Sequence, residues 1–201
     1  NDTAGALSMT EATVTTGSGA LTLTGDVTSV SAASSSTISG NLSLGDTSRT
    51  FTIANGGAAD DLVASAVISG AASVGFTKSG AGLMALSGAS ANTYTGTTTV
   101  TDGTLEIRKD GALGTAAAGT TVASGKTLAI SGNVTYTFAE AITLNGGIFS
   151  NVSGTNVFPG AFTLGAASTF TAAAAGTLTL SGNLSAGTFL PTFQGAAGTI
   201  N

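Results

Sequence analysis

LTLSGNLS, residues 178–185, is the clearest copy of a pattern that recurs along the chain. Its first half alternates apolar and polar residues, which is the period of a β-strand with one buried face. Gly182 and Asn183 come next, and both residue types enter left-handed backbone space more readily than most. The pattern therefore predicts a strand, a tight corner and a second strand. Three more copies lie at residues 21–28, 37–43 and 128–135.

Further strand-like segments fill the gaps between these copies. They alternate in the same way and end at Gly-rich turns, at residues 51–53, 97–100, 104–107, 141–144, 161–164 and 168–171. Only residues 58–66 show a weak helical period. The Gly-Asn or Gly-Asp corners are 15, 92 and 50 residues apart. The chain is therefore predicted to be an irregular repeat array with several kinds of corner.

Two all-β architectures compete for such a chain. A sandwich or jelly roll has longer strands, more polar loops and aromatic anchors in its core. A β-solenoid has strands of a few residues, Gly, Asn and Thr at its corners, and a narrow core of small branched side chains. The second fits better, so we predict one β-solenoid domain over residues 1–201, with irregular coils of roughly 20 residues.

Composition excludes several other classes of protein. Charged residues make up only 7% of the chain, against roughly 25% in typical soluble domains. Val, Ile, Leu and Phe recur throughout, which argues against disorder. No run approaches the ~20 apolar residues of a membrane-spanning helix, so we expect no membrane-spanning segment. The net charge of −5 argues against nucleic acid as a partner.

The chain has no cysteine and no histidine. It therefore lacks thiolate chemistry, nucleophile–His catalysis and the usual ligands for zinc, copper and haem. We expect no cofactor, no metal and no catalytic residue. The chain begins at Asn1 without the features of a signal peptide, which predicts that such a peptide has been removed or that the sequence is part of a longer protein.

One segment, residues 67–114, carries a family resemblance. It contains FTKSGAG at residues 76–82, NTYTGTTTV at 92–100 and GTL at 103–105. These resemble the autotransporter-associated β-strand repeat, also called the passenger-associated transport repeat, of bacterial surface proteins. Residues 83–86 depart mildly from the usual Thr-Leu pair. The resemblance implies a right-handed parallel β-helix in the extracellular part of a bacterial protein, secreted or at the cell surface.

Several polar residues have alternative interpretations. Tyr94 is a candidate contact residue, but a ring that covers a corner with its hydroxyl in water is the commoner use. Asn92 and Asn133 could form side-chain ladders or bind sugar, although Asn more often forms turns. Arg108 and Lys109 are the only adjacent cations, and we expect a solvated corner there.

Carboxylates offer two further candidates. Asp60 and Asp61 could help to hold Ca²⁺, but the calcium β-roll repeat is absent and a solvated loop is the simpler reading. Asp102 and Glu106 resemble a glycosidase pair only in residue type. Asp102 precedes Gly103 in a predicted turn, and no carboxylate cluster, aromatic platform or His accompanies the pair. We therefore predict that the protein is not an enzyme.

Sequons and one loop complete the candidates. Five Asn-x-Ser/Thr sequons exist, three of which coincide with the repeated corner and follow from its pattern. Residues 151–160 are the best candidate for a binding loop, although a broken coil is the simpler interpretation. The five sequons begin at Asn1, Asn41, Asn133, Asn151 and Asn183.

The functional prediction is a stiff extracellular rod in a surface fibre or stalk. The ends of a solenoid expose unpaired backbone groups and an open core, so end-to-end self-association is expected, by a head-to-tail contact. The alternative is an adhesin or autotransporter passenger module that binds a cell surface or polysaccharide through a Thr-rich face.

Overall fold

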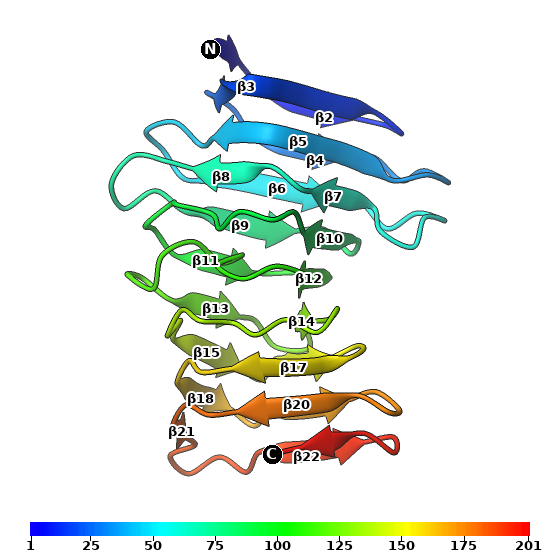
Figure 1. The fold of residues 1–201 in the computed structure, drawn as a ribbon, viewed down its shortest axis with the longest axis vertical. Helices are drawn as coiled ribbons and strands as arrows, with labels where there is room; N and C mark the ends of the chain where they lie inside the picture. Colours follow the sequence, from blue (N-terminus) through cyan, green and yellow to red (C-terminus); the bar gives the residue numbers. More distant parts are fainter.

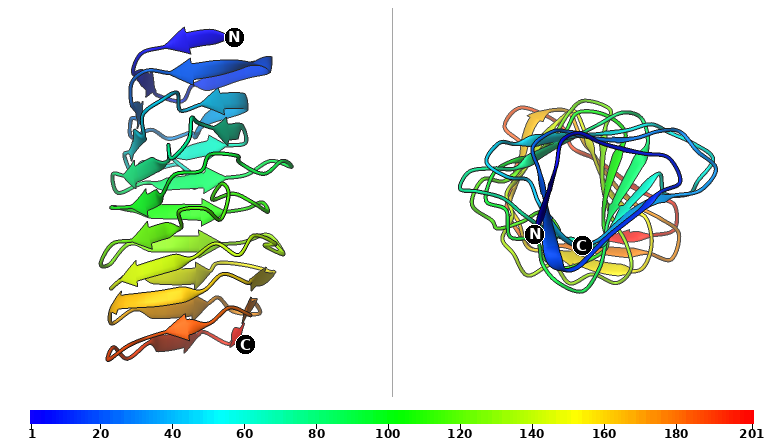
Figure 2. Two further views of the ribbon diagram at one scale, coloured as in Figure 1. Left: turned by 90° about the vertical axis from the view of Figure 1, so that its left-hand side faces the viewer. Right: turned by 90° about the horizontal axis from the view of Figure 1, so that it is seen from above.

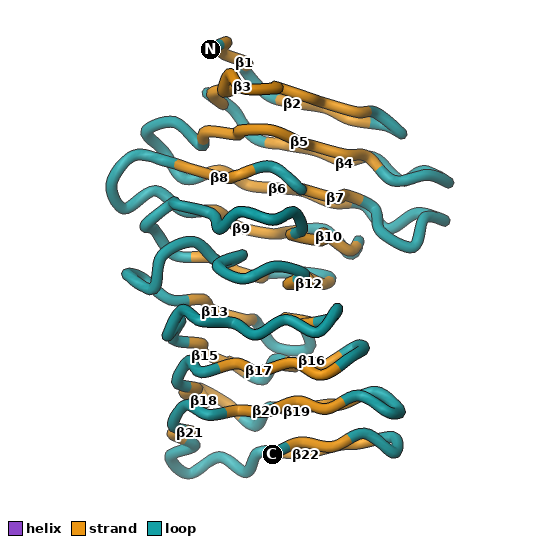
Figure 3. The backbone as a smooth tube through the Cα atoms, in the orientation of Figure 1, coloured by secondary structure: helices purple, strands orange, loops and turns teal.

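The computed structural model describes all 201 residues as a stack of short parallel strands. Figure 3 shows strands and loops only, with no helix. The chain winds through about nine turns from the N-terminus at one end to the C-terminus at the other (Figure 1). The predicted all-β solenoid is confirmed. No helix in the structure is long and apolar enough to cross a membrane.

The strands form three sheets along the stack, and most coils contribute two or three strands to them. The largest sheet contains β1 (Asp2–Ala4), β3 (Thr13–Leu23), β5 (Ser36–Ser43), β7 (Leu62–Ala64), β8 (Val67–Ser69), β10 (Leu83–Leu86), β12 (Thr104–Ile107), β14 (Thr127–Ile130), β16 (Ile148–Asn151), β19 (Thr169–Ala172) and β22 (Thr192–Gly195). The second contains β2 (Leu7–Met9), β4 (Val27–Ser29), β6 (Arg49–Ile53), β9 (Phe76–Ser79), β11 (Thr98–Val100), β13 (Thr120–Val122), β15 (Ile142–Asn145), β18 (Phe162–Ala166) and β21 (Leu184–Ser185). The third contains β17 (Thr155–Phe158), β20 (Thr177–Leu180) and β23 (Thr199–Ile200).

The coil is right-handed, as the resemblance implies. In Figure 1 the chain descends while the nearer strands β5 and β8 point left and the fainter, more distant β4 and β6 point right. Seen from above, the coils superimpose as a ring around a central core (Figure 2). Coil length varies, because 19 residues separate the paired Asp2 and Leu21 whereas 26 separate Leu42 and Ile68.

The core consists of side chains stacked in register from coil to coil. One inward-facing column in the largest sheet is continuous over six coils and changes from aliphatic to aromatic along the rod. The parallel pairing places each side chain on its counterpart about 4.8 Å away. The column consists of Met84, Leu105, Leu128, Phe149, Phe170 and Phe193.

Three of the four predicted Gly-Asn or Gly-Asp corners are confirmed. They separate β3 from β4, end β14 and separate β20 from β21. The fourth prediction, at Gly40-Asn41, is wrong because β5 continues through it. Gly40 has φ +90°, and the two halves of β5 pair with β7 and β8 in the next coil. The residue therefore bends the strand without ending it.

The six further predicted strands are all present within one or two residues, as β6, β11, β12, β15, β18 and β19. The weak helical signal at residues 58–66 is wrong, since β7 lies there. A continuous hydrophobic core runs from Met9 to Leu178. The prediction of one domain over residues 1–201 stays a prediction.

Candidate functional site

Charged side chains are unevenly distributed along the rod. All fifteen lie within residues 1–140, so residues 141–201 carry no Asp, Glu, Lys or Arg. Seven of the fifteen lie close together on the coils of residues 67–114 and on the coils next to them. We call these seven residues the charged cluster: Asp60, Asp61, Lys78, Asp102, Glu106, Arg108 and Lys126.

Lys78 lies inside the solenoid. The alternation of β9 places it on the same face as the buried Phe76, and the residue is 0% exposed. Its Nζ donates to the carbonyl oxygens of Ser79, Gly80 and Asp102 at 3.1, 2.7 and 3.0 Å. Burial lowers the pKa of Lys78 to about 8, while the Asp102 and Asp61 carboxylates oppose that shift. The side chain therefore joins one corner to the next coil.

Arg108 holds two carboxylates on the outer face of the largest sheet. It donates to both oxygens of Asp60 at 2.7 and 2.6 Å and to Glu106 at 2.7 Å. Glu106 also accepts a short hydrogen bond from the Ser131 hydroxyl in the next coil. The bonds to Asp60 and Glu106 raise the pKa of Arg108 above its usual range. This network couples three coils.

Replacing Arg108 should destabilise the rod. In Arg108→Ala, the Glu106 side chain, which is 4% exposed, loses its cation. We expect a loss of about 2 kcal/mol in unfolding free energy, because a buried carboxylate without a cation is costly. Lys126→Ala is the matched control, since its pair with Asp102 is 34% and 41% exposed and such pairs contribute less than about 1 kcal/mol. Urea denaturation of both variants checks this, and equal losses would contradict the account.

Lys109 does not lie in the predicted solvated corner. The residue is 4% exposed, and its Nζ donates to the Ala66 carbonyl at 3.1 Å and to Asn92 Oδ1 at 2.9 Å. Burial lowers the pKa of Lys109 to about 8. Asn92 also accepts from the amide of Ile68 and donates to the carbonyl of Ala112. This buried Asn bridges coils through the backbone and Lys109; it forms neither a simple turn nor a ladder with another Asn.

Aspartates and Asn133 connect corners in the same way. Asp61 is 5% exposed and accepts from the amides of Gly56 and Leu83 at 2.7 and 2.8 Å, so the prediction of a solvated loop is wrong for it. Asn133 does form a turn, with φ +63°, and its Oδ1 accepts from the amide of Thr155 in the next coil. These polar groups hold the backbone of one coil to the next.

Tyr94 is fully buried, so the prediction that its hydroxyl reaches water is wrong. Its ring packs edge-on against Phe76 at 5.5 Å. Its hydroxyl is 2.6 Å from the Thr98 hydroxyl, and burial raises the pKa of Tyr94. The sequence did not reveal this inner position, because the aromatic ring that Tyr94 packs against, Phe76, lies in the preceding coil.

Glu140 was not identified from the sequence and is 1% exposed. One oxygen accepts from the Thr120 hydroxyl at 2.8 Å, whereas Oε2 has no partner. Burial raises the pKa of Glu140 to about 7, and the Thr120 bond opposes that shift. The carboxyl is therefore largely protonated in mildly acidic solution.

Glu140 makes stability depend on pH. Its folded-state pKa is above its ordinary value of 4.5, so the folded state binds the proton more tightly and unfolding free energy falls as pH rises from about 4.5 to 7. We expect the unfolding temperature of the wild type to fall by several degrees over this pH range, relative to that of Glu140→Gln. The Gln side chain keeps an oxygen that accepts the hydrogen bond from Thr120. Parallel curves for the two proteins would contradict the assignment.

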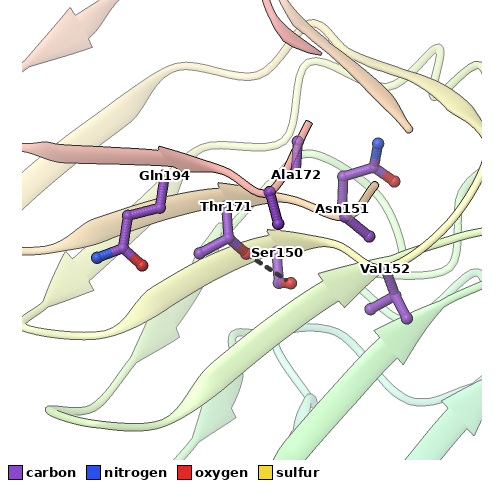
Figure 4. Close-up of a pocket in the computed structure, with 8 residues that line it drawn as sticks. Ser150, Asn151, Val152, Thr171, Ala172 and Gln194 are labelled. Carbon is purple, nitrogen blue, oxygen red and sulfur yellow. Dashed lines mark hydrogen bonds between the residues drawn. The ribbon is translucent and has the colours of Figure 1, made fainter. Parts of the chain in front are cut away.

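Two hollows lie in the uncharged part of the rod. The first, of about 330 Å³, is on the outer face of β16, β19 and β22. Figure 4 shows Ser150, Thr171 and Gln194 in successive strands, with the Ser150 and Thr171 hydroxyls hydrogen-bonded at 2.7 Å. The second, of about 370 Å³, lies at the C-terminal coil between Leu180, Leu184, Phe193 and Ile200.

The two candidate catalytic carboxylates from the sequence, Asp102 and Glu106, each form an ion pair. Asp102 pairs with Lys126 at 2.6 Å, which lowers the pKa of Asp102, and Glu106 pairs with Arg108. Neither carboxylate lines any of the four cavities. The charged cluster thus holds the carboxylates in ion pairs and does not direct them to a cavity.

The structure also places the candidate calcium site and the candidate binding loop. No group of three or more Asp or Glu side chains is arranged to hold a metal ion. Residues 151–160 form a tight corner and the regular strand β17, so the prediction of a broken coil is wrong. Asn151 is 0% exposed and accepts a hydrogen bond from Asn156 at 2.7 Å, so the folded chain cannot accept a glycan there.

The geometry defines a class of protein: a right-handed parallel β-solenoid whose few charged side chains join neighbouring coils. Residues 76–107 match the family described as passenger-associated-transport-repeat. This match lies within residues 67–114 and confirms the resemblance seen in the sequence. The repeat and the fold fit an autotransporter passenger module, and the family suggests a secreted or cell-surface protein. No curated protein and no solved structure matches the chain.

Proposed function

We propose that the chain is a non-enzymatic, extracellular length of stiff rod that serves in a surface stalk or fibre and associates end to end. The observation that supports this most is the use of its charged residues. All five cations bind carbonyl or carboxylate oxygens of the chain: Arg49, Lys78, Arg108, Lys109 and Lys126. Such bonds resist the sliding and bending of one coil against the next.

Arg49 illustrates this use. It is 8% exposed, and it donates to the carbonyls of Leu44, Thr24 and Leu23 at 2.8, 3.0 and 2.8 Å. Two of these carbonyls belong to the preceding coil. A cation committed to three backbone acceptors has little capacity left for an anionic ligand. The side chain stabilises the stack.

Two measurements test the proposal. Antibodies against the purified chain should label intact bacterial cells that produce it, as strongly as permeabilised cells. Labelling that requires permeabilisation would contradict an extracellular rod. The purified chain should release no sugar from a panel of bacterial and plant polysaccharides, and sustained product release would contradict the non-enzymatic part of the proposal.

A second candidate is an adhesin module, favoured by the first hollow. Its hydroxyls and the Gln194 amide lie beside Val152, which is 48% exposed, so it combines polar and apolar contacts without charge. A glycan-array and cell-binding assay tests it. Binding that is lost in Gln194→Ala and kept in Thr99→Ala, a change on the second sheet, would favour the adhesin.

A further inference from the structure

Lys109 is a buried cation without a carboxylate beside it. The residue is 4% exposed, and none of the four ion pairs of the chain includes it. Its Nζ instead contacts the carbonyl oxygen of Ala66 and the carboxamide oxygen of Asn92, at 3.1 and 2.9 Å. Taking an ammonium group out of water without an anion is costly. A nitrogen without charge at this position would avoid that cost.

Burial also makes Lys109 a nucleophile. It lowers the pKa of Lys109 to about 8, so at neutral pH a larger share of the side chain is neutral amine than in an exposed lysine. A lysine whose pKa is lowered by burial can attack a carbonyl carbon. The carbon within its reach is Cγ of Asn92, because Nζ already lies within hydrogen-bond distance of the oxygen on that carbon.

The carboxamide of Asn92 is fixed in place for such an attack. Its Oδ1 accepts from the amide of Ile68 at 2.9 Å, and this donor stabilises the negative charge that forms on Oδ1 when a nucleophile adds to Cγ. Its Nδ2 donates to the carbonyl of Ala112 at 2.6 Å, a bond that strengthens when Nδ2 gains positive charge before it leaves. Asn92 is 1% exposed, so water is excluded as a competing nucleophile.

The other two lysines lack this arrangement. Nζ of Lys78 contacts backbone carbonyls only. Nζ of Lys126 contacts the Asp102 carboxylate at 2.6 Å, in a pair that is 34% and 41% exposed. That bond lowers the pKa of Asp102, so the carboxylate stays ionised and does not react with an amine. Lys126 therefore serves as the matched control for Lys109.

We propose that Lys109 and Asn92 join covalently, through an isopeptide bond between Nζ of Lys109 and Cγ of Asn92. The neutral amine adds to Cγ, and Oδ1 carries the negative charge of the tetrahedral state. A proton then passes from Nζ to Nδ2, the Cγ–Nδ2 bond breaks, and Nδ2 leaves as ammonia. The reaction replaces one amide by another and consumes no oxidant, cofactor or water. The structure describes the pair before this reaction.

The bond closes residues 92–109 into a covalent ring that spans most of one coil. It removes the buried charge of Lys109, and it ties the segment that precedes β11 to the segment that follows β12. The inference goes beyond the proposed rod and does not depend on it, because the reaction needs only the local geometry of the two side chains.

Mass spectrometry of the intact, denatured chain tests the bond. We expect the chain to be lighter than its sequence mass by one molecule of ammonia. Lys109→Arg keeps a cation but has no amine nucleophile, so it should have its full sequence mass, whereas Lys126→Arg should still lose ammonia. The full sequence mass in the unchanged chain would overturn the inference, and that result does not require any variant to fold.

Peptide mapping locates the bond. Trypsin cleaves after Lys and Arg, and acylation of Nζ protects Lys109 from it. The expected product is therefore a branched peptide in which residues 79–108 are joined to residues 109–126. Loss of ammonia without this branch, by cyclisation of another Asn, would overturn the proposal. Neither measurement bears on the labelling of cells, so the cross-link and the extracellular rod can fail independently.

Discussion

Phe149→Ala should lower the unfolding free energy by about 4 kcal/mol, the largest effect that we expect from one substitution. Phe149 is 0% exposed, and its ring contacts Phe158, Phe162 and Phe170 at centroid distances of 5.3, 4.9 and 6.4 Å. Removing a buried Phe side chain costs about 3–5 kcal/mol through lost transfer free energy and the remaining cavity. A column of stacked side chains offers little room to collapse into that cavity.

Phe189→Ala is the matched control for this prediction. Phe189 is 38% exposed and lies between β21 and β22, outside the aromatic stack. We expect a change below about 1 kcal/mol. Denaturant unfolding of both variants, each compared with the unchanged chain, measures the difference. Similar losses for the two variants would contradict the proposed core.

Gly103→Ala should lower the unfolding free energy by about 3 kcal/mol, because of the backbone geometry at this position. Gly103 has φ +62°, a conformation that costs an L-residue about 1–2 kcal/mol. A Cβ atom there would also lie 2.5 Å from the carbonyl oxygens of both Gly80 and Gly82 in the preceding coil. Neither carbonyl can move without disturbing the corner that holds Lys78, so the steric term adds to the conformational term.

Gly125→Ala separates these two terms. Gly125 has φ +69°, close to that of Gly103, but a Cβ atom there would meet nothing within 4 Å. Gly125→Ala should therefore lose only the conformational contribution, about 1 kcal/mol of unfolding free energy. Thermal unfolding of both variants, followed by circular dichroism, measures the difference. Equal losses of stability in Gly125→Ala and Gly103→Ala would contradict the close packing of one corner against the next.

The strands could be predicted from the sequence because their signal is local. An alternation such as Thr104-Leu105-Glu106-Ile107 establishes both the strand and its buried face within four residues. The position of Gly132 and Asn133 likewise establishes a corner, since both take positive φ. In the third sheet β17 was harder to predict than β20, because the turn before it, residues 152–154, contains a single Gly.

The roles of polar residues could not be predicted, because their partners are remote in the sequence. Lys109 reaches Ala66, which is 43 residues away, and Arg108 reaches Asp60, which is 48 residues away. Adjacent cations at residues 108 and 109 look like a solvated corner until the register of the coils is known. The alternation at residues 76–79 did carry the signal that Lys78 points inward with Phe76, and it could have identified that site.

The distribution of charge has a functional meaning in this account. The charged residues join the coils of the first 140 residues, whereas residues 141–201 stack without any charged side chain. A rod of this kind needs rigidity along its length. The bonds between neighbouring coils supply it where the charged side chains lie.

One column of outward-facing side chains runs along the largest sheet. The distance between spin labels at the two ends of this column tests the stacked rod most directly. The column passes in register through eight steps, from Thr13 through Thr37, Val63, Ala85, Glu106, Ala129, Ser150 and Thr171 to Gln194. With labels at Thr13→Cys and Gln194→Cys, diluted in unlabelled protein, pulsed electron paramagnetic resonance should give one narrow peak near about 38 Å, at about 4.8 Å per coil. A much shorter distance, or a broad distribution, would contradict the rod.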